Sequence, residues 1–564
     1  MRAEGGSASP ALSVQRRRIQ IRGQVQGVGF RPFVYRLAEQ FHLSGWVRNT
    51  PAGVTLEIQG QADTLDAMLS ALQQELPPQA SVTGMEIVTI ATLPEQRFVI
   101  LDSEVGASTA RIAPDTAICP DCLAELFGED DRRRHYPFIN CMHCGPRYTI
   151  AARLPYDRQN TAMAKFPLCP QCFHEYQDPY NRRFHAEATA CPACGPKLEL
   201  CDAAGAILAT DDPLGAAAAR LQAGEILALK GLGGFHLLCD ARNPAAVQRL
   251  RERKSRDEKP FALMLPNIAS LDSLAHCGEA ERTLLESAQR PIVLLECTGD
   301  DLPGVADGLR ELGVMLPYTP LHYLLFHVLA GEPAGSEWLT QAHPWALVCT
   351  SANPGGEPLV RENEEALQRL HGLADVMLLH DREILHRADD SVLRLMDGAP
   401  AFLRRSRGYV PVPIGLPADG PSVLAVGGYF KNTICLTRGN EAFLSPHIGS
   451  LDNAATCEFL EETVANLSQV LEIVPKAVAH DAHPDFFSSR FAVEFAAQHH
   501  IPAFAVQHHH AHIAAVAAEH GINEPLLGLA LDGVGLGSDG MPWGGELLRV
   551  DGARFERLIR ILLR

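Results

Sequence analysis

Alternating apolar and polar positions divide the first hundred residues into short strands separated by two helices. Apolar side chains recur at every second position in Arg18–Arg22, in Val54–Ile58 and, more loosely, in Arg97–Ile100, which is the spacing of a half-buried strand. Phe30–Phe41 and Ala62–Gln74 instead carry apolar residues at helical spacing. The pattern therefore predicts a compact βαββαβ unit within residues 16–103.

A glycine-rich turn links the first of these strands to the first helix. Gly27 and Gly29, in the string G-Q-V-Q-G-V-G-F-R, allow backbone N–H groups to converge at a helix N-terminus, which favours anion binding. Arg31 adds a guanidinium that can hold two phosphate oxygens. The glycines alone fit an ordinary strand-to-helix turn equally well. With the following G-W-V-R-N, however, the segment resembles the acylphosphatase family, and this implies that Arg31 binds phosphate and Asn49 orients the attacking water.

Residues 212–413 follow an α/β pattern. Ile226–Leu229 is an apolar run that predicts a buried strand, and Asn243 followed by proline predicts the start of a helix that ends near Arg253. The charged run that follows, up to Pro260, is in isolation typical of a solvated helix end.

Cations, hydroxyls and amides gather at the predicted ends of elements in this region, and they suit a bound triphosphate. The combination of K-x-R-x-x-K-P with S-A-N resembles the YrdC family, which makes a carbamoyl-type adenylate from ATP. The resemblance implies nucleotide and phosphate contacts, to ATP with Mg, from six residues: Lys230, Lys254, Arg256, Lys259, Ser351 and Asn353. It extends to two adjoining residues, His322 and Arg407.

The last part of the chain opens with a short buried strand at Val423–Val426 and a helix predicted from Asp452 to Leu471. Further on, His508 and His512 belong to H-H-H-A-H. One helical turn apart, they lie on the same side of a helix and can hold one metal ion. Asp532 is predicted at the end of another buried strand, where a carboxylate flanked by glycines suits a metal-bound nucleotide.

H-H-x-A-H with the later L-D-G strand resembles the TsaD-like group of carbamoyl and threonylcarbamoyl transferases, which has an actin-like fold of two lobes. The resemblance implies a further divalent metal, iron or zinc, held by His508, His512 and Asp532. Because the chain stops soon after G-G-E, we expect only the first lobe of this fold in residues 420–564.

Eight of the fifteen cysteines form four Cys-x-x-Cys pairs with a repeated spacing. Each pair places two thiolates on one edge of a tetrahedron, so four pairs predict two structural zinc sites. A disulfide framework is the alternative, but a chain of this size does not need such cross-links. The spacing leaves open which pairs share a metal. The predicted ligands are Cys119, Cys122, Cys141, Cys144, Cys169, Cys172, Cys191 and Cys194.

Composition places the chain among ordinary globular proteins, with 46% hydrophobic and 21% charged residues over 564 positions. This length predicts about four domains. The net charge of −18 makes a nucleic-acid partner an unfavourable prediction. Residues 1–14 read as a disordered Gly/Ser/Ala/Pro tail without the core of a signal peptide, and no apolar run approaches the roughly 20 residues that cross a bilayer. We therefore expect a cytoplasmic protein with no membrane contact.

Four motif sets in this order resemble the HypF family of hydrogenase-maturation carbamoyltransferases. The expected fold class is multidomain, with α+β and α/β parts. The expected domains are a ferredoxin-like acylphosphatase-like domain (15–103), a double zinc-finger module (104–200), a YrdC-like α/β domain (205–415) and a TsaD-like domain limited to the first lobe (420–564).

The resemblance implies a route of three steps. Carbamoyl phosphate is hydrolysed to carbamate at Arg31 and Asn49, carbamate and ATP then give carbamoyl-adenylate and pyrophosphate, and the carbamoyl group passes to the C-terminal cysteine of the partner HypE. The product becomes the cyanide ligand of a nickel–iron centre. Keeping unstable carbamate within one chain raises its effective concentration. Two alternatives stay open: a tRNA-threonylcarbamoylating fusion enzyme, and a zinc-ribbon scaffold with inactive enzyme domains.

Overall fold

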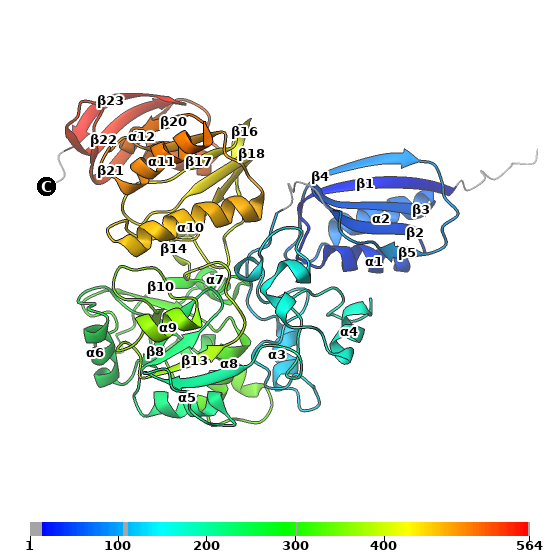
Figure 1. The fold of residues 1–564 in the computed structure, drawn as a ribbon, viewed down its shortest axis with the longest axis horizontal. Helices are drawn as coiled ribbons and strands as arrows, with labels where there is room; N and C mark the ends of the chain where they lie inside the picture. Colours follow the sequence, from blue (N-terminus) through cyan, green and yellow to red (C-terminus); the bar gives the residue numbers. More distant parts are fainter. Residues whose placement is uncertain (1–13, 105–110, 300–301, 562–564) are drawn as a thin grey trace, which may run out of the picture.

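The computed structural model describes residues 14–104, 111–299 and 302–561. The predicted tail, residues 1–14, lies outside the described residues apart from Val14. Figure 1 shows four folded regions, coloured in chain order from blue to red. The small zinc module (cyan) lies between the acylphosphatase-like domain (blue) and the YrdC-like domain (green), and the TsaD-like domain (yellow to red) packs beside the YrdC-like domain.

The acylphosphatase-like domain is a five-stranded sheet with two helices, in strand order β4-β1-β3-β2-β5. Ile19 and Ile21 on one face of β1 are fully buried, which confirms the alternation read from the sequence. Strand β5 falls in the loosely alternating segment of the prediction and runs parallel to β2 at the sheet edge. The strand that the structure adds is β4, which pairs with β1. The elements are β1 (Val14–Gln24), α1 (Phe30–Gln40), β2 (Ser44–Thr50), β3 (Gly53–Gln61), α2 (Ala62–Gln74), β4 (Ser81–Ile90) and β5 (Phe98–Ile100).

The zinc module contains little regular structure. Its two longest helices each begin at the proline that follows the first cysteine of a Cys-x-x-Cys pair, because proline is already in the backbone conformation of a first helical residue. Phe127 of this module packs edge-on against Trp338 of the YrdC-like domain at 5.3 Å, so the two share one apolar core. The elements are α3 (Pro120–Phe127), η1 (Tyr148–Ile150), η2 (Arg158–Asn160), η3 (Ala162–Lys165) and α4 (Pro170–Gln177).

The YrdC-like domain is built on a ten-stranded mixed sheet, in order β15-β14-β10-β11-β9-β12-β8-β7-β13-β6. The predicted buried strand is β7, all four residues of which are buried. Asn243 caps α6 as predicted, its side chain accepting a hydrogen bond from the Ala246 N–H at 3.2 Å. The strands are β6 (Leu198–Asp202), β7 (Leu227–Lys230), β8 (Phe235–Asp240), β9 (Ala262–Met264), β10 (Ile292–Glu296), β11 (Glu311–Met315), β12 (Leu347–Ser351), β13 (Val376–His380), β14 (Val392–Met396) and β15 (Ala399–Arg404). The helices are α5 (Pro213–Gln222), α6 (Pro244–Arg253), η4 (Ile268–Ser270), α7 (Glu279–Glu286), α8 (Pro320–Leu329), η5 (Glu337–Thr340) and α9 (Asn363–Arg369).

The TsaD-like domain contains two separate sheets. The first, in order β16-β18-β17-β19-β20, carries the helices α10 and α11, and the second is an antiparallel sheet of β21, β22 and β23. Helix α12, which holds the histidine cluster, packs against β21 and β22. The elements are β16 (Ile414–Gly420), β17 (Val423–Ala425), β18 (Cys435–Leu444), α10 (Ala454–Leu471), β19 (Ala477–Asp481), α11 (Phe487–His499), β20 (Ala503–Val506), α12 (His508–Glu519), β21 (Leu526–Leu536), β22 (Pro542–Asp551) and β23 (Arg554–Ile561).

One local prediction is wrong. Asp532 does not end a buried strand, because β21 continues to Leu536 and its outward side chains Leu527, Leu529 and Leu531 are 66%, 53% and 63% exposed. The continuous apolar run resembled a strand covered on both faces, whereas this antiparallel sheet buries only one face. Over the described residues, no helix is both long and apolar enough to span a membrane.

Candidate active sites and metal centres

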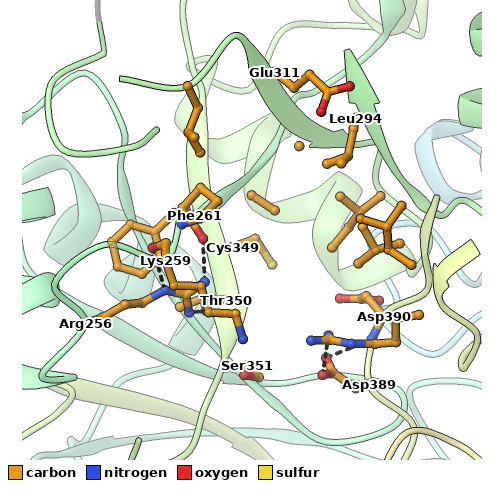
Figure 2. Close-up of a pocket in the computed structure, with 18 of the residues that line it drawn as sticks. Arg256, Lys259, Phe261, Leu294, Glu311, Cys349, Thr350, Ser351, Asp389 and Asp390 are labelled. Carbon is orange, nitrogen blue, oxygen red and sulfur yellow. Dashed lines mark hydrogen bonds and ion pairs between the residues drawn. The ribbon is translucent and has the colours of Figure 1, made fainter. Parts of the chain in front are cut away.

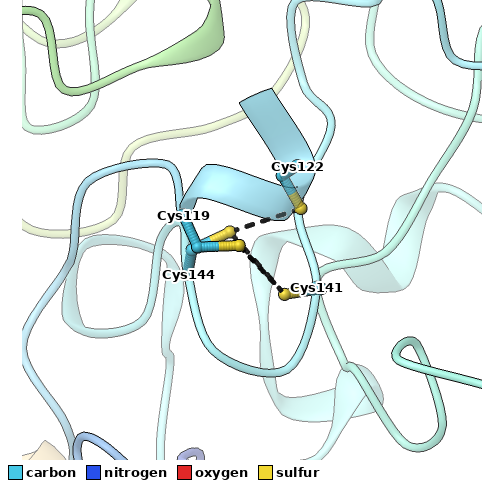
Figure 3. A group of neighbouring side chains, drawn as sticks. All are labelled: Cys119, Cys122, Cys141 and Cys144. Atoms are coloured by element: carbon cyan, nitrogen blue, oxygen red, sulfur yellow. Dashed lines mark hydrogen bonds between the residues drawn. The ribbon is translucent and has the colours of Figure 1, made fainter. Parts of the chain in front are cut away.

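The eight paired cysteines form two groups of four thiols. Figure 3 shows the side chains of Cys119, Cys122, Cys141 and Cys144 gathered at one point. The Sγ–Sγ distances in this first group are 3.6–3.9 Å. In the second group, Cys169, Cys172, Cys191 and Cys194, they are 3.7 Å. Tetrahedral Zn–S bonds of about 2.3 Å require separations near 3.8 Å, so each group fits one zinc ion. Neighbouring pairs therefore share a metal, no cysteine is in a disulfide, and the module holds two structural zinc sites.

The two zinc sites are joined by arginines that cross between the repeats. Arg182, in the second repeat, donates to Cys119 Sγ at 3.2 Å and to Cys122 Sγ at 2.8 Å in the first. Arg132, in the first repeat, donates to Cys172 Sγ in the second at 3.2 Å. Such outer hydrogen bonds orient thiolates and compensate their charge. Glutamates on the short helices hold the same arginines: Glu125 with Arg182 and Arg183, and Glu175 with Arg132 and Arg133.

The phosphate cradle, formed by Gly27, Gly29, Arg31 and Asn49, lies between α1 and β2. Gly27 and Gly29 both have positive φ, at 71° and 74°, a conformation that favours glycine. With its amide oxygen facing Arg31, Asn49 accepts hydrogen bonds from Nε at 3.2 Å and Nη2 at 3.3 Å. The structure thus brings the two predicted residues together, in a small cavity of about 20 Å³.

The zinc module supplies the other wall of this cradle. Asp157 lies 3.2 Å and Glu187 3.5 Å from Arg31 Nη2. Glu187 also accepts hydrogen bonds from the Tyr176 hydroxyl (2.9 Å) and the Arg158 N–H (3.0 Å). Burial raises the pKa of Glu187 to about 7, against the opposing effect of Arg31. Sequence analysis missed both carboxylates, because they belong to the zinc repeats and approach the cradle only in the folded chain.

A large cavity of about 760 Å³ lies between the YrdC-like and TsaD-like domains. Three predicted residues line it: Arg256, Lys259 and Ser351. Figure 2 shows Arg256, Lys259 and Ser351 at one end of the cavity, with Leu294 and Glu311 at the other. Lining residues that sequence analysis missed are Thr350, Asp389, Asp390 and Arg404 of the YrdC-like domain and Lys431 and His447 of the TsaD-like domain.

Two cations of the large cavity, Arg256 and Lys259, have no carboxylate ion-pair partner among the described residues. Arg256 donates to the Thr350 hydroxyl at 2.9 Å and lies over the Phe261 ring at 4.7 Å. Burial, reinforced by neighbouring arginines, lowers the pKa of Arg256 to about 10 and also lowers that of Lys259. Asp389 is already paired with Arg404. Arg256 and Lys259 therefore give this end of the cavity uncompensated positive charge, which suits a polyanion such as a triphosphate.

Two more predicted residues lie directly behind this wall. Lys254 donates to the Ser351 carbonyl at 2.8 Å and to Asn353 Oδ1 at 3.1 Å, while the Ser351 hydroxyl donates to the same Oδ1 at 2.9 Å. Burial lowers the pKa of Lys254 to about 7. These three residues therefore form one hydrogen-bonded unit that fixes the S-A-N turn.

The other three predicted residues of this domain do not line the large cavity. Lys230 lines a separate small cavity beside the zinc module. His322 is fully buried, and burial lowers its pKa to about 3. Arg407 is also buried, where it pairs with Asp390 at 2.6 Å and lies 3.5 Å over the Tyr318 ring.

The histidine cluster is arranged as a metal site. His508 Nε2 lies 3.2 Å from His512 Nε2 and 3.1 Å from Asp532 Oδ2, and all three could bind one ion. The other ring nitrogen of His508 contacts Asp481 at 2.6 Å, and this hydrogen bond raises the pKa of His508. A carboxylate behind a histidine is the usual support of a metal ligand. The sequence pattern did not single out Asp481.

Comparison with protein families matches each region in turn. The matching family models are acylphosphatase (residues 17–100), the HypF finger (118–151 and 168–201), the Sua5/YciO/YrdC family described as telomere recombination (219–406), the HypF Kae1-like domain (418–519) and the second subdomain of the carbamoyltransferase Kae1-like domain (528–562). By fold and site, the chain is thus a multidomain carbamoyltransferase that includes an acylphosphatase domain.

Whole-chain relatives specify the family. The chain is 61% identical to carbamoyltransferase HypF2 of Cupriavidus necator and 51% identical to carbamoyltransferase HypF of Rhizobium leguminosarum, covering 96% of this chain and 68% of each relative. A crystal structure of full-length HypF in the phosphate- and nucleotide-bound form superposes with a TM-score of 0.91 at 41% identity, over 98% of this chain and 70% of that one. The chain belongs to the HypF family of carbamoyltransferases.

Proposed function

We propose that this chain converts carbamoyl phosphate and ATP into a protein-bound carbamoyl group in three steps. Water and carbamoyl phosphate give carbamate and phosphate, carbamate and ATP give carbamoyl-adenylate and pyrophosphate, and a thiolate then takes the carbamoyl group and releases AMP. The observation that carries the proposal is the large cavity, because residues of both the YrdC-like and the TsaD-like domain line it. An adenylate formed there is already in contact with the domain that uses it.

The first step is assigned to the phosphate cradle. Arg31 holds the phosphoryl oxygens, backbone N–H groups of the glycine turn add further donors, and Asn49 orients the water that attacks phosphorus. Phosphoryl transfer depends mainly on positioning and charge compensation, which matches a site without a nucleophilic side chain. To bind there, the substrate phosphate displaces Asp157 and Glu187 from Arg31.

The second step is assigned to the YrdC-like wall of the large cavity. Arg256 and Lys259 bind the phosphates of ATP with Mg, while Ser351, held by Lys254 and Asn353, contacts the nucleotide. Binding a polyanion removes the mutual repulsion that depresses the pKa values of these cations. The attacking group is the carbamate oxygen, the bond formed joins it to the α-phosphorus, and pyrophosphate leaves.

The third step is assigned to the TsaD-like domain, with the C-terminal cysteine of HypE as acceptor and the nickel–iron cyanide ligand as destination. His508, His512 and Asp532 would hold a divalent metal, iron or zinc, and such a metal would supply Lewis-acid polarisation of an oxygen. The Asp532 Oδ2 atom faces the ring nitrogen of His508 at 3.1 Å, which fits two ligands of one metal ion. Asp481 orients His508 within this set.

The decisive experiment measures AMP formation from ATP with carbamoyl phosphate present or absent, and with or without tRNA. We expect AMP only with carbamoyl phosphate, and the same amount whether or not tRNA is added. AMP formation that depends on threonine and tRNA would instead support the tRNA-modifying fusion enzyme. A chain that binds zinc but forms no AMP with either substrate would support the scaffold.

A further inference from the structure

A second small cavity lies between the zinc module and the YrdC-like domain. It measures about 30 Å³, which is room for a molecule of a few atoms and far too little for a nucleotide. Lys230 at the end of β7 and His380 at the end of β13 lie on its YrdC-like side, with Arg382 just beyond. β7 and β13 are parallel neighbours, and the carboxyl ends of parallel strands are where α/β sheets bind ligands.

Unpaired polar atoms are concentrated around this cavity, which we call the Lys230–Arg382 cavity. Four of its lining residues each carry a buried side-chain atom without a hydrogen-bond partner in the described structure: Asn140 Oδ1, Tyr318 Oη, His380 Nδ1 and Arg382 Nε. Folded proteins leave few buried polar groups unpaired. Four around one small space indicate that a polar molecule completes their hydrogen bonds.

The charged side chains around the cavity indicate that this molecule is negatively charged. Lys230 is 4% and Arg382 6% exposed, and within the described chain neither forms an ion pair. Lys230 donates only to neutral acceptors, Asn363 Oδ1 at 2.7 Å and the His380 carbonyl at 3.0 Å. Burial lowers the pKa of Lys230 to about 8 and that of Arg382 to about 10. Asp115 and Asp381 raise the pKa of Arg382, and Asp381 that of Lys230, through space and without an ion pair. Two buried, uncompensated cations favour an anion over water.

We propose that the Lys230–Arg382 cavity binds a small planar oxyanion and that, on the route proposed above, this anion is carbamate. Arg382, Lys230 and the Tyr318 hydroxyl donate to its two oxygens. Asn140 Oδ1 and His380 Nδ1 accept from its amino group. His380 is suited to this role because its other ring nitrogen lies 3.3 Å from the Gly231 carbonyl, which places the ring proton there.

The position of the cavity fits a holding site between the first two reactions. One segment of the zinc module forms walls of both small cavities: Asn140 and Gly145 line the Lys230–Arg382 cavity, while Met142 and Arg147 line the phosphate cradle. On the opposite side, Tyr318 lies against Arg407, whose partner Asp390 lines the large cavity. Carbamate released at Arg31 therefore has a cationic site one segment away, formed by buried side chains.

Binding is tested with ¹³C-bicarbonate, a stable planar oxyanion, followed by NMR line broadening on the purified chain. We expect Arg382→Gln to weaken binding at least about tenfold and Tyr318→Phe, which removes only the unpaired hydroxyl, about threefold. Tyr323→Phe is the matched control, because Tyr323 is a buried tyrosine of the next helix that does not line the cavity. If Tyr318→Phe and Arg382→Gln both bind bicarbonate like the control, the cavity holds only water and the proposal is wrong.

The identity of the anion is tested by the ratio of AMP formed to phosphate released from carbamoyl phosphate. We expect this ratio to fall about tenfold or more in Arg382→Gln, and to recover when concentrated ammonium carbamate supplies the anion from solution. Tyr318→Phe provides the same test, with a smaller drop, if Arg382→Gln does not fold. An unchanged ratio in a variant that has lost bicarbonate binding overturns the assignment of carbamate, as does AMP formation supported equally well by bicarbonate and ATP alone. A wild-type chain that forms no AMP contradicts the proposed route, whereas the bicarbonate titration still decides whether the anion site exists.

Discussion

The phosphate cradle and the large cavity both present cations to a phosphate-sized group, yet their charges are arranged in opposite ways. Arg31 already has Asp157 and Glu187 beside it, in a space of about 20 Å³. Arg256 and Lys259 face about 760 Å³ without a carboxylate partner in the described chain. The cradle is thus neutralised before substrate arrives, and the large cavity is not.

This difference shows what the zinc module adds to an acylphosphatase fold. Its carboxylates compete with substrate for Arg31, so an anion must be able to displace them before it is hydrolysed. In the large cavity no carboxylate competes for Arg256 and Lys259, so these cations attract a polyanion and are stabilised by it. We expect the cradle to be selective and weakly binding, and the large cavity to bind nucleotide tightly.

The largest effect is expected from unfolding the zinc module, because this module contacts both the phosphate cradle and the core of the YrdC-like domain. Cys122→Ser takes one thiolate from a buried zinc site, and its apolar surroundings continue into the core of the YrdC-like domain. We expect loss of about one zinc per chain and about 5 kcal/mol or more of stability, since metal binding and folding are coupled. Metal analysis and thermal unfolding measure this. Cys277→Ser, a half-exposed cysteine outside both metal sites, should leave both values unchanged.

Removing one unneutralised cation from the large cavity should lower the rate of adenylate formation strongly. A change in the cradle should not alter how the chain binds ATP. Lys259→Ala should lower carbamoyl-phosphate-dependent exchange of pyrophosphate into ATP by about 100- to 1,000-fold, the usual value of a preorganised charge at a reacting centre. Phosphate release in the same sample reports on the cradle. Arg253→Ala is a control, because Arg253 pairs with Asp375 away from the cavity. Normal exchange in Lys259→Ala would contradict the proposed ATP site.

Arg31→Ala should affect the cradle alone. We expect carbamoyl-phosphate hydrolysis to fall about 100-fold, because the guanidinium that holds the phosphoryl oxygens is lost. Asn49→Ala should lower the maximal rate similarly with less effect on substrate affinity. ATP binding measured by calorimetry should stay as in wild type. If Arg31→Ala hydrolyses carbamoyl phosphate normally, the cradle does not bind the substrate phosphate.

The smallest expected effect is a pH dependence of anion binding at the cradle. Glu187, with its pKa raised to about 7 by burial, is neutral below that pH and competes for Arg31 above it. Affinity for sulfate, which does not titrate in this range, should therefore fall about three- to tenfold from about pH 6 to about pH 8. His185, whose pKa burial lowers to about 4, stays neutral throughout. Glu187→Gln should bind sulfate more tightly at high pH and lose the dependence; a variant that keeps the wild-type slope would show that another group titrates.

Local sequence patterns predicted those parts of the molecule whose residues are close along the chain. The Cys-x-x-Cys spacing identified both zinc sites, and the turn before Arg31 identified the cradle. Arg256 and Lys259 also follow one another closely. In each case the backbone itself brings the side chains together, so spacing carries the information.

Features that depend on contact between domains could not be read in this way. Asp157 and Glu187 reach Arg31 from a module whose sequence signals only metal binding, and Lys431 and His447 complete the large cavity from another domain. The prediction that Asp532 ends a buried strand was wrong because the outward leucines of β21 are exposed. An apolar run alone does not show whether one or both faces of a strand are covered. The resemblance to the YrdC family implied a phosphate contact for Lys230, but only the folded sheet places it in a cavity separate from that of Lys259.

The crossed arginines of the zinc module also have a consequence for synthesis. The thiolates of the first repeat depend on Arg182, which emerges from the ribosome some sixty residues after Cys119. Until then the first repeat lacks its compensating charge, and the second repeat depends in turn on Arg132 of the first. Nascent chains complete domains as units, so a ribosome stalled between the two repeats should carry a chain that does not retain its first zinc ion against a chelator, although all four of that ion's ligands have already been made.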